Sequence, residues 1–306
     1  MGMLAWTTPA FAAEFFGEFL YWKATETVDW VLNTNRDPLQ QYIDYGSTEF
    51  GFSPGFRIGV QQSGEWDVRA SWTRFSTSTT ASESGDLTAA FLGGKNSQPP
   101  APQLYFDTGQ LEASIDYNMI DLDLGKAFQL GESLRIRPLV GLRGGMIEQS
   151  FTTAFQAEYD SGGSTSQRNI VETATNDFWG IGPKIGIENQ YTLRKTEHLE
   201  LNVTANFYMA YLLGDWQVHD VTAVTQIDGG MTSTSSQVIQ TSPRDFGSLT
   251  FQTIVGVQLK YGHLTATAGY ELNDWLNQCQ IFTDASGPQN NDLLLQGLTV
   301  RLAYNF

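Results

Sequence analysis

The end of the chain carries the pattern that most restricts the fold. From residue 298 onward apolar and polar side chains alternate, with Leu298, Val300, Leu302, Tyr304 and Phe306 at the apolar positions. A period of two predicts a β-strand with one face against apolar surroundings. A final strand that pairs with the first strand would close the sheet and leave no open edge. This stretch therefore favours a closed membrane β-barrel, although a soluble β-sandwich could also contain such a strand.

Composition is consistent with that fold class. Aromatic residues make up 13% of the chain and charged residues only 16%, below the roughly 25% of soluble domains. Mean hydropathy is −0.24, and no run approaches the about 18 apolar residues that a membrane helix needs. A membrane barrel has this composition because lipid-facing residues alternate with lumen-facing ones. A soluble all-β fold also fits the composition by itself.

Charge and cysteine content exclude several function classes. The net charge is −16, which argues against a nucleic-acid partner because such a partner requires a basic surface. Cys279 is the single cysteine, so neither an intrachain disulfide nor a cysteine-based metal site is expected.

The first residues resemble a processing leader. The triplet Ala10-Phe11-Ala12 fits the small-x-small signal of signal peptidase and follows a mildly apolar stretch. We predict a signal-peptide remnant at 1–12 and a barrel domain at 13–306, with a mature start at Ala13 or Glu14. A frayed N-terminus is the alternative, since the charged region of a leader is missing.

Ten strands are expected, with room for twelve. They are predicted at about 14–28, 56–61, 66–73, 111–124, 134–143, 179–187, 199–213, 249–259, 264–272 and 298–306. Short turns join them near 62–65, 131–132, 193–198 and 261–263. The alternation slips near Met119, which predicts a β-bulge there.

Five polar stretches are predicted as long loops on the opposite side, at 29–49, 76–103, 148–176, 214–244 and 273–292. The first and fourth are long enough to contain extra strands or a plug. Most of the acidic excess lies in these five stretches, where it could bind divalent cations or form a solvated surface. No calcium-binding spacing is present, so no metal site is predicted.

Tryptophan and tyrosine residues gather near the predicted strand ends, as in interfacial girdles. The predicted girdle positions are Trp66, Tyr261 and Tyr304 on the turn side and Trp30, Trp72, Trp179, Trp216 and Trp275 on the loop side. Together these features predict a transmembrane antiparallel up-and-down barrel in the outer membrane of a Gram-negative bacterium. Its short turns would be periplasmic and its long loops extracellular.

Charged residues of both signs fall on the predicted lumen face. They are Arg57, Asp67, Arg69, Glu112, Asp116, Asp121, Asp123, Arg135, Arg137, Arg143, Lys184, Glu200, Glu271 and Arg301. Such residues either pair and fill a narrow interior or line an aqueous pore. The sequence leaves both readings open.

An enzyme is disfavoured. The histidines are His198, His219 and His263, of which the first and last fall in predicted short turns. His219 stands beside Asp220 without a second carboxylate cluster, which is thin support for catalysis. No cofactor motif is visible.

Several stretches resemble the Legionella major outer membrane protein family, which also has relatives in environmental chlamydiae. They are Phe-Leu-Tyr-Trp-Lys at 19–23, Phe-Trp-Gly-Ile-Gly-Pro-Lys at 178–184, Gly-Tyr-Glu at 269–271 with Trp-Leu-Asn-Gln at 275–278, and Leu-Gln-Gly-Leu-Thr-Val-Arg at 295–301. The resemblance implies a pore-forming outer-membrane protein without catalytic residues. Cysteine-rich members of such coats cross-link through disulfides, and Cys279 alone does not provide for that.

We therefore expect a porin that lets small solutes or ions diffuse passively, without a cofactor. The alternative is a structural or adhesive barrel with a closed lumen and interacting loops. Expected partners are outer-membrane lipid, small solutes and the assembly machinery, whose C-terminal recognition signal Tyr304 and Phe306 resemble. A homo-oligomer is compatible with this fold class.

Overall fold

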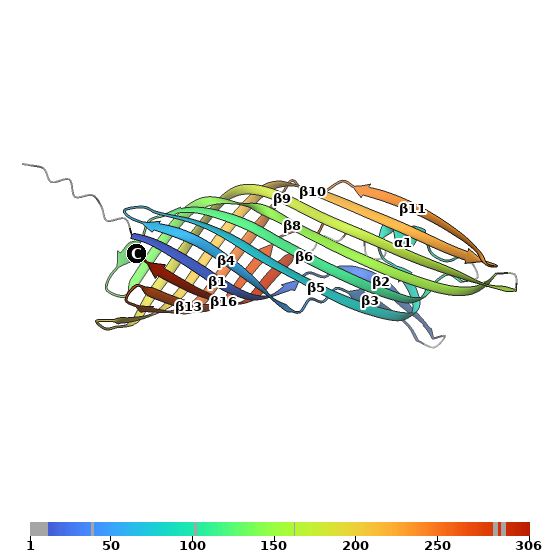
Figure 1. The fold of residues 1–306 in the computed structure, drawn as a ribbon, viewed down its shortest axis with the longest axis horizontal. Helices are drawn as coiled ribbons and strands as arrows, with labels where there is room; N and C mark the ends of the chain where they lie inside the picture. Colours follow the sequence, from blue (N-terminus) through green and yellow to red (C-terminus); the bar gives the residue numbers. More distant parts are fainter. Residues whose placement is uncertain (1–11, 38–39, 101–102, 162, 284–286, 289–291) are drawn as a thin grey trace, which may run out of the picture.

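The protein is a closed antiparallel β-barrel of ten strands, as the sequence predicts (Figure 1). The computed structural model describes residues 12–306 except 38–39, 101–102, 162, 284–286 and 289–291. The barrel strands are β1 (Ala12–Thr25), β4 (Phe52–Ser63), β5 (Asp67–Ala89), β6 (Phe106–Gly125), β8 (Leu134–Ser161), β9 (Ser164–Lys195), β10 (Leu199–Asp228), β12 (Gly247–Tyr261), β13 (Leu264–Trp275) and β16 (Leu293–Asn305). The predicted leader at 1–12 lies outside the described residues except for Ala12, so it stays a prediction.

The remaining elements lie around the barrel wall or inside it. They are β2 (Asp29–Asp37), β3 (Gln40–Ser47), β7 (Phe128–Leu130), α1 (Leu92–Asn96), β11 (Met231–Thr241), β14 (Phe282–Thr283) and β15 (Gly287–Pro288). Within the described residues, no helix is long and apolar enough to span a membrane.

The first and last strands close the barrel. β1 pairs with β16 without a break, from Glu14 opposite Asn305 to Thr25 opposite Leu294. The amide of Phe306 donates a hydrogen bond to the Ala13 carbonyl at 2.9 Å. The predicted seam between the two strands is therefore confirmed. The start of β1 and the end of β16 both lie on the side of the short turns (Figure 1).

The predicted long loops are wrong in their main part, because the strands continue through them. The loop predicted at 76–103 begins with the second half of β5. The loop predicted at 148–176 is filled by the ends of β8 and β9. The loop predicted at 214–244 is the end of β10 followed by β11. Sequence alternation missed these segments because most of their outward side chains are polar, chiefly Ser and Thr, rather than apolar.

Strand β8 shows how the polarity of the wall reverses along the barrel. Near the short turns its outward side chains are apolar, as at Val140 and Leu142, while Arg143 is buried inside. Further along, Phe151 and Phe155 are buried inside and the outward positions are polar. The outer face therefore meets an apolar medium in one half and water in the other.

The same reversal explains the wrong prediction of a bulge near Met119. Strand β6 pairs with β8 in unbroken register from Thr108 to Gly125. Its apolar residues up to Met119 face inward, whereas Ile120 and the alternate residues after it face outward. The apparent slip in alternation marks the level at which the two faces exchange character.

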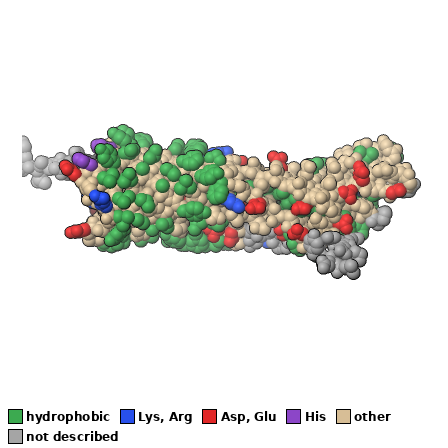
Figure 2. All heavy atoms as spheres, turned by 90° about the horizontal axis from the view of Figure 1, so that it is seen from below, with side chains coloured by type: hydrophobic (Ala, Val, Ile, Leu, Met, Phe, Trp, Pro, Cys, Tyr) green, Lys and Arg blue, Asp and Glu red, His purple; other side chains and the backbone are tan. Residues whose placement is uncertain are grey.

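The outward apolar side chains form a continuous band next to the short turns, the apolar belt (Figure 2). Its members are Phe15, Phe19, Tyr21, Phe56, Ile58, Val60, Trp66, Val68, Trp72, Ile120, Leu122, Leu124, Val140, Leu142, Met146, Trp179, Ile181, Ile185, Ile187, Phe207, Leu213, Val255, Val257, Leu259, Tyr270, Leu272, Leu298, Leu302 and Tyr304. We call the part of the molecule beyond the belt the distal half. Figure 2 shows more acidic than basic side chains on its surface.

Two of the predicted tryptophans on the loop side, Trp72 and Trp179, are exposed. The other three, Trp30, Trp216 and Trp275, are buried inside the barrel and do not belong to a girdle. They occupy inward positions above the level of reversal, where the interior is apolar.

The distal half is filled by its own core. Its wall is the curved sheet β3-β2-β5-β6-β8-β9-β10-β11. Two segments enter its interior, namely the strap at 90–97, which contains α1, and the plug segment at 275–283. An isolated bridge between Phe91 and Thr283 joins the two.

Candidate functional site

The barrel interior at the level of the apolar belt contains charged side chains from eight of the ten barrel strands. The inward positions are fixed by strand alternation, so residues two apart on one strand point into the same space. The carboxylates and cations of the branches described next are part-buried or buried. They form two groups of ion pairs, which hydrogen bonds of Gln252 join into one network.

Arg57 on β4 lies at the centre of the network. Its Nη1 is 2.5 Å from Glu18 Oε2, and its Nη2 is 2.8 Å from Glu271 Oε1 on β13. Glu18 also binds Arg301, whose Nη2 is 2.6 Å from Glu14 Oε1. This branch crosses the seam between β1 and β16 on the inner side.

A second branch spans the lumen from β8. Arg143 Nε donates to Asp121 at 2.8 Å, and its Nη2 donates to Gln252 Oε1 at 2.6 Å. The Gln252 amide in turn donates to Glu271 at 2.6 Å. Because Gln252 is on β12, with β9 and β10 between it and β8, this chain of bonds runs across the interior rather than along the wall.

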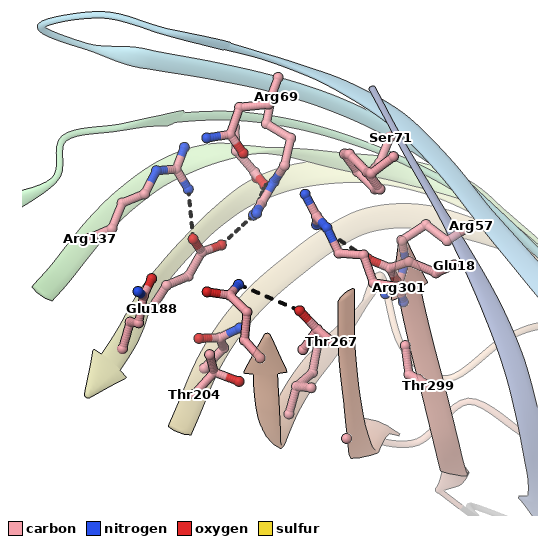
Figure 3. Close-up of a pocket in the computed structure, with 18 of the residues that line it drawn as sticks. Glu18, Arg57, Arg69, Ser71, Arg137, Glu188, Thr204, Thr267, Thr299 and Arg301 are labelled. Atoms are coloured by element: carbon pink, nitrogen blue, oxygen red, sulfur yellow. Dashed lines mark hydrogen bonds and ion pairs between the residues drawn. The ribbon is translucent and has the colours of Figure 1, made fainter. Parts of the chain in front are cut away.

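A third branch joins β5, β6, β8 and β9. Arg69 Nη2 lies 2.8 Å from Asp123 Oδ2 and 2.6 Å from Glu188 Oε1. Arg137 bridges Glu188 and Asp67 at 3.1 and 3.2 Å. Figure 3 shows Arg69 and Arg137 approaching Glu188 from two directions.

Lys184 connects the second and third branches. Its Nζ is 3.2 Å from Asp121 Oδ1 and 3.0 Å from Asp123 Oδ1. The ammonium also lies 4.8 Å from the centroid of the Tyr208 ring. With these contacts the network is continuous from Asp67 to Glu14.

A polar cavity of about 200 Å³ lies within the network and reaches the level of the short turns. Glu14, Gln61, Arg135, Gln190, Lys260 and Arg301 line its outer part, and all six are part-buried. Figure 3 looks into this space.

An apolar layer covers the network on its distal side. Trp22 lies against Arg57, with the guanidinium carbon 5.7 Å from the ring centroid, and its Nε1 donates to Thr299 at 3.1 Å. Phe75 packs on Trp22, and Tyr117 packs edge-on against Trp275. These four rings are buried, and they belong to the same core that continues through the distal half.

Asn176 on β9 anchors the plug segment. Its Nδ2 donates to the Gln278 carbonyl at 3.1 Å, and its Oδ1 accepts from the Gln280 amide at 3.0 Å. Trp216 Nε1 donates to the same Gln278 carbonyl at 3.1 Å. The Asn176 side chain thus donates to and accepts from the plug backbone, as the backbone of a neighbouring strand would.

The strap is held by two buried carboxylates in the distal half. The Gly93 amide donates to Asp220 Oδ2 at 3.0 Å, and the Gly94 amide donates to Glu172 Oε1 at 2.7 Å. Burial, followed by the neighbouring charge of Asp220, raises the pKa of Glu172 to about 9. Glu172 therefore holds a proton at neutral pH.

The structure places most of the predicted lumen residues in one interior. Arg57, Arg69, Arg137, Arg143, Lys184 and Glu271 are buried members of the network, Arg301 is a part-buried member, and Arg135 lines the cavity. Glu200 lies near the short turns and accepts a hydrogen bond from Gln190 at 3.1 Å.

Glu112 and Asp116 are exceptions, because they lie on the outer face of β6. Asp116 pairs there with Arg74 at 3.2 Å. The predicted bulge near Met119 placed these two residues on the lumen face, which is wrong because β6 continues in unbroken register.

Three network carboxylates were missed. Glu14 and Glu18 lie on β1, whose apolar residues on both faces obscure the alternation. Glu188 lies just beyond the predicted end of its strand. Acidic residues recur at even positions at Glu14 and Glu18 of β1 and again at Glu26, just after the strand, and this recurrence is the signal that could have found the first two.

The histidine alternative has no geometric support. His219 and Asp220 are adjacent on β10, so they point to opposite faces. Asp220 is buried inside with the strap, whereas His219 faces outward. In the described part of the chain, no group of three or more His, Cys, Asp or Glu residues is arranged to hold a metal ion.

Comparison with known proteins agrees with this architecture. Residues 7–306 match the family described as Legionella pneumophila major outer membrane protein precursor. The chain belongs to this family. It is an outer-membrane protein of Gram-negative bacteria, and the apolar belt is the surface that faces lipid. No match was found among curated proteins.

Two solved structures of outer-membrane barrels resemble the chain only distantly. The outer membrane protease OmpT from Escherichia coli is 12% identical, with 98% of this chain and 99% of that chain covered and a TM-score of 0.44. The toluene transporter TodX from Pseudomonas putida is 7% identical, with 97% and 90% covered and a TM-score of 0.27.

Proposed function

We propose that the protein is a structural or adhesive outer-membrane barrel. Its part at the level of the apolar belt is closed and anchors the protein in the membrane, and its distal half makes the contacts outside. The observation that carries this proposal is the interior at belt level. Charged side chains bond across the lumen there, as in the chain from Asp121 through Arg143 and Gln252 to Glu271.

Passage of a solute would require two kinds of disruption. The charged side chains are paired with one another, and removing one partner of a buried pair costs about 3–5 kcal/mol. Above them the buried rings of Trp22, Phe75, Tyr117 and Trp275 continue the obstruction with apolar contacts. Both layers favour a lumen that is filled rather than conducting.

The location of the distal half also supports the proposal. Barrels of this class have short turns on the periplasmic side, which puts the distal half outside the cell. Extending the wall well beyond the belt and giving it a core of its own provides a rigid external body. A pore by itself does not need such a body, because loops between the strands would be enough to connect them.

A porin is the second candidate function. The polar cavity of about 200 Å³ favours it, because charged residues line that cavity up to the short-turn level. Such a lining would suit the inner vestibule of a pore for small ions if the network above it opened.

Single-channel recording from refolded protein in planar bilayers separates the two candidates. We expect no steady conductance from the wild type. A steady conductance that changes in Arg137→Glu and not in Glu112→Arg would overturn the closed-anchor proposal, because Arg137 lies in the lumen and Glu112 on the outer face.

A further inference from the structure

Strand β11 forms a sheet edge in the distal half. In the described chain it pairs with β10 alone, from Asp228 opposite Met231 to Val218 opposite Thr241. The connecting residues Gly229 and Gly230 have φ values of 54° and 85°, as in the two-glycine form of a type I′ hairpin turn. This turn fixes the register of the hairpin.

The register determines which backbone groups of β11 are unpaired. In a two-residue hairpin the flanking residues, here Asp228 and Met231, form a hydrogen-bonded pair, and such pairs then recur at every second residue. The backbone N–H and C=O groups of residues 232, 234, 236, 238 and 240 therefore point away from β10. Among the described residues, no backbone hydrogen bond reaches this edge.

The edge lacks the features that usually prevent strand addition. Residues 231–241 read Met-Thr-Ser-Thr-Ser-Ser-Gln-Val-Ile-Gln-Thr, without a charge, proline or glycine. Natural edge strands are normally protected by such residues or by a bulge. Met231 and Val238 are 77% and 65% exposed. The opposite edge strand of this sheet, β3, carries Asp44.

We propose that β11 is an adhesive edge that pairs antiparallel with β11 of a second copy of this chain. The free-edge residues are self-complementary about Ser236. A two-fold axis there places Ser236 opposite Ser236, Thr234 opposite Val238, and Thr232 opposite Gln240. No like charges are opposed in this arrangement, although the chain as a whole carries a net charge of −16.

The geometry further indicates where the second copy comes from. β11 runs along the long axis of the molecule (Figure 1). Antiparallel pairing therefore reverses the long axis of the second copy. Copies in one membrane share their orientation, so the paired copies lie in two facing membranes. The inference rests on the proposed function, because it gives the distal half a homotypic adhesive contact.

The acidic distal surfaces oppose this approach. Two such surfaces repel each other over about 8–10 Å at moderate ionic strength. Pairing through β11 is therefore expected to strengthen as salt is raised. Contacts made by surface ion pairs would weaken instead.

Clustering of phosphatidylcholine vesicles that carry the full chain tests the proposal. We expect wild-type vesicles to cluster, as read by turbidity and light scattering. Ser236→Pro removes a free-edge N–H without touching a bond to β10 and should abolish clustering, whereas the matched control Ser236→Ala should retain it. Heat-modified electrophoretic migration verifies that each barrel is folded.

A charge exchange tests the register. Vesicles with Ser236→Lys alone and vesicles with Ser236→Asp alone should stay dispersed, and a mixture of the two should cluster. If wild-type vesicles stay dispersed, β11 does not pair with a second copy and the proposal fails. The partner of the edge would then be a strand from another protein. Clustering that persists in Ser236→Pro, or a mixture that fails to cluster, also overturns it. Conductance is measured separately, so failure here is distinguishable from failure of the closed-anchor proposal.

Discussion

Arg57 on β4 and Glu271 on β13 meet inside the barrel at 2.8 Å, with the seam strands β1 and β16 between them in the wall. Neither residue neighbours the other in the sheet, so the pair braces the closure from within. Glu271 is fully buried and accepts hydrogen bonds from Arg57, Gln252 and Thr299. A carboxylate at this depth is tolerable only with such partners.

Replacing Arg57 by Met should therefore destabilise the barrel by about 3–5 kcal/mol, because Glu18 and Glu271 would be left buried without their cation. Urea unfolding in vesicles measures the loss. Arg74→Met is the matched control, since Arg74 pairs with Asp116 on the exposed outer face and should cost at most about 1 kcal/mol. Equal losses in both variants would contradict the bracing role.

The buried carboxyl of Glu172 should make the distal half sensitive to pH. Its pKa is raised to about 9 in the folded protein, against about 4.3 in an unfolded chain. Between these values the unfolded state releases a proton that the folded state keeps, so stability falls as pH rises from about 5 to about 9. Urea midpoints across this range should show the decline.

In Glu172→Gln the decline should flatten, because the amide cannot titrate but can still accept from the Gly94 amide. Asp228→Asn is the comparison, since Asp228 is exposed and should leave the profile unchanged. An identical pH profile for wild type and Glu172→Gln would refute this assignment.

Gly93 in the strap is packed too closely for a side chain. A Cβ there would lie 1.6 Å from Thr222 Oγ1 and 2.9 Å from Glu172 Oε1. Gly93→Ala should therefore displace the strap, at a cost of about 1–3 kcal/mol. Limited proteolysis of the strap and the urea midpoint report the change. Gly51→Ala, where a Cβ would meet nothing within 4 Å, should behave like the wild type, and a strap equally resistant in both variants would count against the packing.

Phe306 combines a structural contact with the proposed assembly signal. Its ring lies 5.6 Å from the Phe15 ring and 4.9 Å from the Tyr304 ring, yet the residue is 69% exposed. Deleting it should reduce assembly in cells far more than lost burial of one side chain, about 1.5–3 kcal/mol, can explain. The measurement is the folded fraction in outer-membrane extracts.

The control for that deletion is Phe128→Ala, which removes another exposed aromatic side chain near the short turns. It should assemble normally. Normal assembly of the chain without Phe306 would show that the terminal residue is no recognition signal.

The closed barrel was predictable wherever the outer face is apolar. The alternation from Leu298 to Phe306 predicts β16 and its lipid-facing side correctly, and Leu298, Leu302 and Tyr304 are exposed in the belt. Alternation is a reliable signal at this level because lipid on one side and charge on the other leave each residue type one allowed face.

The distal half was not predictable in the same way. Its strands carry Ser and Thr outside, as along residues 76–84 of β5, and such residues are equally common in loops. Which carboxylates meet which cations was also beyond the sequence. Arg57 and Glu271 are 214 positions apart, and only closure of the sheet brings them together.

The exchange of faces along β8 has a consequence for how the molecule sits in its bilayer. A barrel with a uniform wall could slide up or down at little cost. Here a shift by two residues along the strand, about 7 Å, would carry Glu148 toward hydrocarbon or expose Met146 to water. The level at which the faces exchange therefore fixes how deeply the barrel is inserted. The stability of the barrel should accordingly depend on the thickness of the bilayer.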